Sequence, residues 1–214
     1  MALDARDRKI ARRSWLLAGL GMGVFRFNLR ASQDLAVTFD GDDLHVAAPG
    51  LHFLTGRPLE RLQDGATVVF VSQLTLFSDD RGTVFRRVPE RLVVSYDLWE
   101  EKFAVTIPGS PSGAAARSHS HMTAAQAEMW CMNNLAISAL GLAPDRPFWL
   151  RFDLRAADRK DLSEILGDSG ISLTGLIDIF SRKPGADGAS WTRNVGPLRL
   201  RDLPRITSRR TRSW

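Results

Sequence analysis

Alternating apolar and polar positions predict mainly β-strands in the first half of the chain. Residues 35–48 alternate on both sides of an acidic turn at 40–43, which predicts two short antiparallel strands. The run 66–77 is rich in Val, Thr and Phe, residues that favour a buried strand over a helix. Residues 91–107 carry apolar side chains at every second position around an acidic centre, and they predict the clearest hairpin of the chain.

Shorter segments connect these strands. Residues 51–64 suit one or two short helical turns punctuated by glycine and proline. A strand is predicted at 83–88, and we expect it to end at Pro89 because proline has no backbone N–H to donate to a neighbouring strand. Small and polar residues over 108–120 predict a mobile loop.

The second half of the chain predicts a helix, a strand and another helix. The best helix covers 123–142, where Thr123 and Gln126 fit an N-terminal capping box. The strand follows at 148–155, where apolar and polar side chains alternate strictly. The inward positions are Phe148, Leu150, Phe152 and Leu154, and the outward positions are Trp149, Arg151, Asp153 and Arg155. A second helix is expected near 172–182.

Together these elements predict an α+β fold. Mainly antiparallel β-hairpins form a sheet or a sandwich, and one long helix and one or two short helices cover it. We expect a single domain over 32–198. A segment of different character, 1–31, precedes it, and a basic, disordered tail, 199–214, follows it.

The N-terminal segment 1–31 has the order of an export signal. A charged head with the pair Arg12-Arg13 precedes a weakly apolar core at 16–25. A bilayer span needs about 20 apolar residues, so this core is too short for a permanent span. The arginine pair, an aromatic residue and two leucines resemble a twin-arginine signal peptide, with cleavage after Ala31. This predicts a protein in the periplasm, or attached to the membrane and facing it. A basic amphipathic helix and an uncleaved anchor stay open as alternatives.

Charge is concentrated at the two ends of the chain. The net charge is +5 and the pI is about 10.1. Segment 1–31 holds seven basic and two acidic residues, and segment 199–214 holds six arginines and one aspartate. The body between them is therefore mildly acidic, which argues against capture of nucleic acid by a basic folded surface. The single cysteine, Cys131, excludes an intramolecular disulfide, and its apolar neighbours predict a buried thiol.

Two segments carry a resemblance to a known family. Residues 59–70, LERLQDGATVVF, combine a leucine helix, a glycine and a strand. Residues 96–105, YDLWEEKFAV, correspond to a hairpin for which the family has a pattern like Tyr-x-x-Leu-x-x-x-Tyr-x-Val, and here Phe103 replaces the second tyrosine. With the helix and strand that follow, this order resembles a bacterial family of exported or membrane-anchored proteins of unknown function, often encoded near two-component sensor kinases. The resemblance implies a signal or anchor at the N-terminus, and it supplies no catalytic residues.

Candidate catalytic chemistry is sparse. His119 and His121 are the sharpest local feature, but two imidazoles do not complete a zinc site, and a solvated pair is the simpler interpretation. The sequence contains no Gly-x-Ser-x-Gly motif, and no phosphate loop or dinucleotide fingerprint follows a predicted strand. These observations favour a non-enzymatic protein without a cofactor.

Aromatic and arginine side chains indicate where a partner would bind. Tyr, Trp and Arg are enriched at protein-contact hot spots. Trp99 is expected at the hairpin tip, and Trp149, Arg151 and Arg155 share the outward face of one strand. We therefore interpret these four residues as candidate partner contacts.

The favoured function is that of an exported, non-enzymatic binding or accessory protein of the cell envelope that contacts another protein. Two alternatives remain. The first is a carrier that holds a small apolar ligand between sheet and helices. The second is a metal-binding protein or enzyme that uses the His119/His121 loop.

Overall fold

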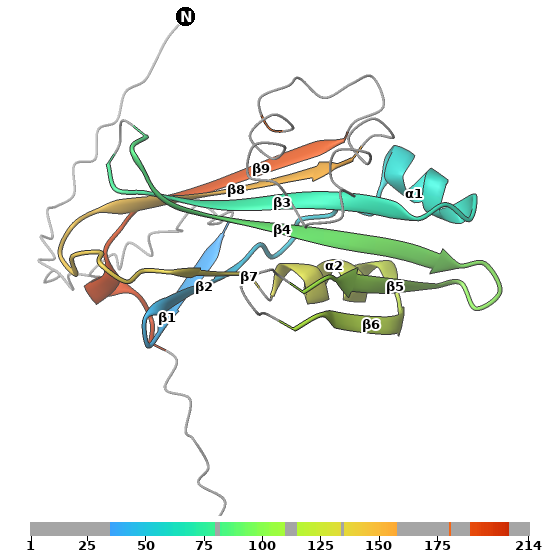
Figure 1. Cartoon of the computed structure of the whole chain (residues 1–214), viewed down its shortest axis with the longest axis horizontal. Helices are drawn as coiled ribbons and strands as arrows, with labels where there is room; N and C mark the ends of the chain where they lie inside the picture. Colours follow the sequence, from blue (N-terminus) through green and yellow to red (C-terminus); the bar gives the residue numbers. More distant parts are fainter. Residues whose placement is uncertain are drawn as a thin grey trace, which may run out of the picture. The chain divides into compact units, whose positions relative to one another are not determined.

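A computed structural model describes residues 35–79, 82–109, 115–133, 135–157, 180 and 189–205. The predicted export signal, with Arg12 and Arg13, lies outside the described residues. The described elements, shown in Figure 1, are β1 (Ala36–Asp40), β2 (Asp43–Ala47), α1 (Gly56–Gln63), β3 (Val68–Phe77), β4 (Val84–Asp97), β5 (Lys102–Ile107), β6 (Arg117–Met122), α2 (Ala124–Met132), β7 (Leu135–Ser138), β8 (Phe148–Ala156), β9 (Ser190–Leu198) and the short 3-10 helix η1 (Leu200–Asp202).

The larger sheet has six described strands in the order β6-β5-β4-β3-β8-β9, and each pair of neighbours is antiparallel. β3 lies near the middle, between β4 and β8, and it is buried along most of its length. A strand covered on both faces needs apolar residues at nearly every position, which explains the continuous Val- and Phe-rich run in the sequence. The predicted α+β fold with mainly antiparallel sheets is confirmed.

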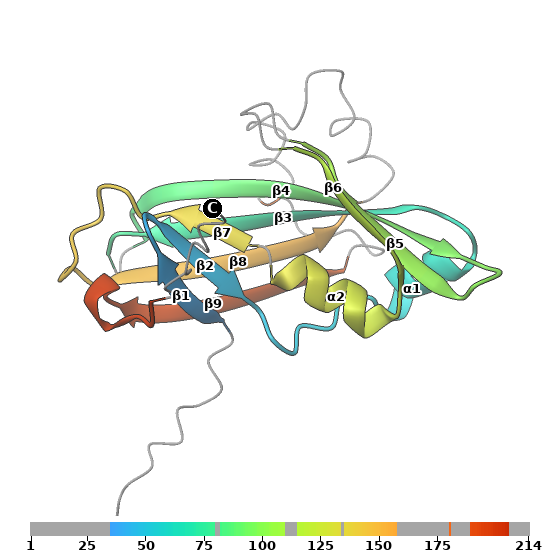
Figure 2. The same cartoon turned by 90° about the horizontal axis from the view of Figure 1, so that it is seen from below.

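A smaller sheet, β1-β2-β7, and the helix α2 lie on one face of the large sheet. They are below the long strands in Figure 1 and in front of them in Figure 2. Their inward side chains, such as Leu44 and Ile137, share one apolar core with Phe70 and Phe152 of the large sheet. Burial of this shared apolar surface is the main contribution to the stability of the fold, and it holds the two sheets together.

The opposite face of the large sheet carries a second, smaller apolar cluster. It consists of Val69, Val71 and Ala157, packed against Val93 and Phe180. These side chains come from positions that alternate with those of the main core, as the two-residue period of a strand requires. The large sheet is therefore covered on both faces near the start of β3.

Both predicted hairpins are confirmed. β1 pairs with β2 in a register that places Val37 opposite Val46. β4 pairs with β5, and Tyr96 lies opposite Phe103 with the two ring centroids 4.8 Å apart. Such cross-strand aromatic pairs stabilise a hairpin. The short helix predicted within 51–64 is present as α1.

The prediction of one long helix over 123–142 is wrong for the second half of that range. The capping box at Thr123 is present, but α2 ends at Met132. Leu135–Ser138 form strand β7, which pairs with β2. Leu135 and Ile137 are buried while Ala136 is exposed, a two-residue period that also fits a helical stripe over so short a stretch. Pairing with β2, which is distant in sequence, decides between the two structures.

Two further predictions about strand limits are corrected. β4 continues through Pro89, which lies opposite Gln73 of β3. β5 pairs with β4 only from Val93 to Asp97, so the other side of Pro89 has no described strand that would need its N–H. The predicted mobile loop 108–120 is too long, because β6 begins at Arg117 and pairs with β5.

The C-terminal part of the described chain is attached to the small sheet. Residues 199–205, the start of the predicted disordered tail, contain η1 with a buried Leu200, and the N–H of Phe39 donates to the carbonyl of Pro204 at 3.0 Å. Residues 206–214, and the helix predicted near 172–182 apart from Phe180, lie outside the described residues. In the described part of the chain, no helix is long and apolar enough to cross a membrane.

Candidate functional site

The tip of the β4–β5 hairpin presents an exposed indole. Trp99 is 96% exposed, and its neighbour Leu98 is 55% exposed. The backbone N–H groups of Trp99 and Glu100 donate hydrogen bonds to Asp97 Oδ1 at 2.8 and 3.0 Å. The hydrogen bonds from Glu100 and Trp99 lower the pKa of Asp97, because they stabilise its charged form. The turn that carries Trp99 is therefore held by its own aspartate.

A second contact fastens the tip to the neighbouring strand. His121 Nε2, at the end of β6, lies 3.1 Å from Glu100 Oε2. Glu101 and His121 both have positive φ angles, 53° and 60°, in the left-handed region that few non-glycine residues adopt. The Asp97 hydrogen bonds thus order the backbone of the turn, and the exposed His121–Glu100 contact links the tip to β6.

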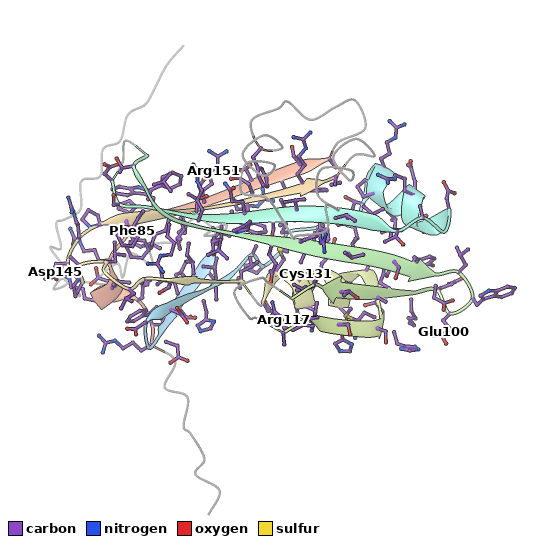
Figure 3. All side chains as sticks on the ribbon, viewed as in Figure 1. Phe85, Glu100, Arg117, Cys131, Asp145 and Arg151 are labelled. Atoms are coloured by element: carbon purple, nitrogen blue, oxygen red, sulfur yellow. The ribbon has the colours of Figure 1, made fainter. Side chains whose placement is uncertain are left out.

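A groove of about 320 Å³ lies toward the opposite end of the large sheet. Trp149 and Arg151 of β8 line it together with Phe77 of β3 and Asn194 of β9. In Figure 3, Arg151 lies on the side of the sheet away from α2, and Glu100 marks the distant hairpin tip. β3, whose 10 residues separate the two ends, is about 30 Å long. Trp99 and Trp149 therefore belong to different surfaces.

The four predicted contact residues differ in exposure. Trp99 and Arg151 are exposed and Trp149 is half-buried, but Arg155 is only 5% exposed. Asp153 is also buried, so the outward face of β8 reaches solvent only near its start. The prediction that Arg155 shares an exposed face with Trp149 and Arg151 is thus corrected: strand alternation assigns a side chain to a face, but whether that face is covered depends on distant segments.

His119 and His121 do not converge on a common point. His119 Nδ1 lies 3.2 Å from the carbonyl of Ser120, and its ring lies edge-on to Trp130 with the centroids 6.2 Å apart. His121 contacts Glu100 instead. Among the residues that the structure describes, no group of three or more His, Cys, Asp or Glu side chains is arranged to hold a metal ion.

A smaller cavity, of about 250 Å³, is lined by residues of both sheets. Glu90 and Arg117 line it, with Arg117 Nη2 2.8 Å from Glu90 Oε1. Burial raises the pKa of Glu90, and the charge of Arg117 partly opposes this shift. Burial, together with the nearby charges of Glu90 and Glu128, raises the pKa of the Cys131 thiol to about 12. Because the thiolate is the nucleophile, Cys131 is an inert core residue, as its sequence context predicts.

Comparison with protein-family models gives no match for this chain, and comparisons with curated proteins and with solved structures give none either.

Several site residues carry no recognisable sequence signal. Asn194 and Gly196 reach the groove from β9, and Phe77 reaches it from β3. Each is unremarkable within its own strand, and only the antiparallel register places them beside Trp149. The Gly196-Pro197 dipeptide marks a local irregularity, but not a binding site.

Proposed function

We propose that this chain is an exported, non-enzymatic accessory protein of the cell envelope that binds another protein through the tip of the β4–β5 hairpin. The observation that carries the proposal is the 96% exposure of Trp99 on a turn that internal hydrogen bonds hold in place. Tryptophan is among the residues most enriched at interface hot spots. A turn that is already ordered loses little conformational entropy on binding.

The charges around Trp99 favour a protein partner with a basic rim. Asp97, Glu100 and Glu101 flank the exposed pair Leu98-Trp99, and Lys102 is the nearest basic residue in the sequence. Anionic lipid headgroups would be repelled by these three carboxylates. A partner with an apolar pocket for the indole, bordered by Lys or Arg, complements both features.

A photocrosslinking residue in place of Trp99 tests this contact in cells that export the protein. A matched probe replaces Leu140, which is 63% exposed but is not part of the tip. We expect one discrete protein adduct from position 99 and none from position 140. The charge reversal Glu101→Lys should weaken or remove the adduct, because it places a positive charge opposite the basic rim of the partner.

The affinity for the crosslinked partner gives a second measurement. Trp99→Ala should weaken binding by about 2 kcal/mol or more, as expected for a hot spot, and should leave the melting temperature unchanged because the indole is exposed. Equal adducts from both positions contradict the proposal. Trp99-dependent sedimentation with neutral lipid vesicles, without a protein adduct, would assign the tip to membrane binding instead.

The export part of the proposal rests on the sequence of segment 1–31. Cell fractionation of wild type and of Arg12→Lys/Arg13→Lys tests it, with N-terminal sequencing of the product. We expect wild type in the envelope or periplasm and the double variant in the cytosol. Wild type that stays in the cytosol contradicts export, and equal export of both proteins contradicts the twin-arginine route alone.

A further inference from the structure

The groove beside Trp149 is an open depression that could hold part of a small molecule. Its volume of about 320 Å³ lies at the lower end of the range for ligand pockets. Aromatic and aliphatic side chains make up much of its lining, and Arg151 and Asn194 add polar groups from two adjacent strands. This surface lies at the opposite end of the sheet from the hairpin tip, so it is independent of the proposed contact at Trp99.

A dedicated contact holds the indole of Trp149 in position. The ring packs directly on the backbone of Gly196, where a Cβ atom would come within 2.4 Å of Trp149 Cδ1. Only glycine allows so close an approach. Trp149 is only partly buried, and it lines the groove, so the part of the indole that Gly196 does not cover faces the groove. The apolar wall of the groove is therefore present before any ligand arrives.

A chain of polar contacts orients the guanidinium of Arg151. Its Nε lies 3.0 Å from Asp153 Oδ1 and 2.9 Å from Oδ2. Asp153 is itself buried and accepts a hydrogen bond from Thr192 Oγ1 at 2.8 Å. Asp153 is the one partner shown for Arg151 in the described part of the chain, and it engages only Nε. The two Nη groups are left for a ligand, and a planar guanidinium held in this way suits a carboxylate.

A carboxylate at the groove disfavours ligands that carry more than one negative charge. Asp79 lines the groove as well, and its Oδ1 accepts a hydrogen bond from the N–H of Thr83 at 2.8 Å. A second negative charge on the ligand would be repelled by this carboxylate, whereas the charge of Asp153 is already paired with Arg151. A dianion such as a phosphate monoester is therefore less suited to the groove than a monocarboxylate.

We infer that this groove binds a small molecule with a flat apolar body and one carboxylate. The apolar body lies against Trp149 and Phe77, and the carboxylate accepts hydrogen bonds from the Nη groups of Arg151, with the Asn194 amide beside it. Arg151 and Trp149 are the binding residues. Asp153 and Gly196 are positioning residues, since they hold those two side chains without lining the carboxylate position.

Calorimetric titration of the full chain with indole-3-acetate and with its neutral analogue indole-3-acetamide tests the inference. The two probes share the apolar body and differ in the charged group. We expect the carboxylate to bind at least about tenfold more tightly, because hydrogen bonds between charged groups are the strong ones. Arg151→Gln should remove this preference and leave the weaker binding of the amide. The matched control is Arg199→Gln, an exposed arginine just after β9, which should change neither affinity.

The side chain of Arg151 is 50% exposed, so its replacement should leave the fold intact, which the melting temperature verifies. If Arg151→Gln does not fold, Arg151→Lys replaces it and should bind the carboxylate with intermediate affinity. Trp149→Leu should weaken both probes, and Trp99→Ala should weaken neither. The inference is overturned if neither probe binds at ~1 mM. It is equally overturned if the preference for the carboxylate survives in Arg151→Gln, or if phenyl phosphate binds more tightly than benzoate.

Discussion

Glu128 Oε1 accepts a hydrogen bond from the backbone N–H of Phe53 at 2.6 Å, across a sequence separation of 75 residues. The same oxygen accepts from the N–H of Leu54 at 2.7 Å, and Oε2 lies 2.8 Å from His52 Nδ1. Glu128 is only 6% exposed, and both backbone donors are buried. One carboxylate on α2 therefore satisfies the segment before α1, where buried N–H groups would otherwise lack acceptors.

Two replacements of Glu128 should distinguish the effect of losing the hydrogen-bond acceptor from the effect of losing the negative charge. Glu128→Ala leaves the N–H groups of Phe53 and Leu54 without their acceptor and should lower the free energy of unfolding by about 3 kcal/mol. Glu128→Gln keeps one carbonyl oxygen for both donors and should cost about 1 kcal/mol. Urea denaturation measures both values, with Glu60→Gln on the exposed face of α1 as the control. Equal losses for the two Glu128 variants would show that the hydrogen bonds are not the cause.

Adding one methyl group at Gly196 should be more harmful than at another glycine with positive φ. Gly196→Ala places a Cβ within 2.4 Å of Trp149 Cδ1 and should destabilise the fold by about 2–4 kcal/mol. Gly41→Ala, at φ +60° with nothing within 4 Å of the added atom, should cost only about 1–2 kcal/mol from backbone strain. Thermal unfolding with chemical shifts of the indole N–H groups compares the variants. Similar losses in both would contradict the close packing of Trp149 on Gly196.

The Cys131 thiol should be unreactive in the folded protein. Its pKa is raised from 9.0 to about 12, so the thiolate fraction at about pH 8 is roughly a thousandfold lower than for an unperturbed thiol. Reaction with a disulfide reagent such as dithiobis-nitrobenzoate should follow unfolding, with complete labelling only in denaturant. Rapid labelling of the native chain would contradict the burial of this residue.

The same shift has a consequence for stability at high pH. Because folding raises the pKa of Cys131, its contribution is complete below the unfolded value of 9.0 and is lost as the pH rises toward about 12. Over that interval Cys131→Ala should therefore lose less stability than wild type as the pH rises. Parallel pH profiles of the two proteins would contradict this linkage.

Removing Arg117 should destabilise the fold more at about pH 8 than at about pH 4. Folding raises the pKa of Glu90, so the contribution of Glu90 is complete below its unfolded pKa and is lost as the pH rises through the folded value. Arg117 offsets that loss by pairing with the ionised carboxylate. Arg117→Gln should therefore cost about 0.5–1 kcal/mol more at the higher pH, a small effect because both side chains are partly exposed. The double variant Glu90→Gln/Arg117→Gln should lose this pH dependence, and if it persists another group is responsible.

The fold could be predicted where local signals decide it. The acidic turn at 40–43, the hairpin of 91–107 and the Thr123–Gln126 capping box all depend on residues close together in sequence, and each lies where the pattern predicts. The second half of the predicted long helix is wrong because a contact distant in sequence, not a local signal, decides its structure. A single alternation around Ile137 fits a helix and a strand equally, and pairing with β2 selects the strand.

The candidate sites also divide into features that local sequence predicts and features that depend on distant contacts. Trp99 at a hairpin tip could be predicted from the sequence because the turn and the exposed position are local properties. The burial of Arg155 could not be predicted, since the alternation of apolar and polar residues assigns it to a face of β8 but does not show whether that face is covered. The groove of Trp149 requires the register of β8 against β9, which joins residues on either side of a long intervening stretch.

By itself the sequence determined the strand-rich α+β class, the two hairpins, the buried cysteine and the exposed tryptophan, because alternation, turn chemistry and apolar context act between near neighbours. Only the tertiary structure decided that Leu135–Ser138 is a strand, that Glu128 anchors the segment at Phe53 and that Arg151 and Asn194 meet in one groove. Those contacts depend on which distant backbone groups find hydrogen-bonding partners and which faces are covered, and no short stretch of residues contains that information.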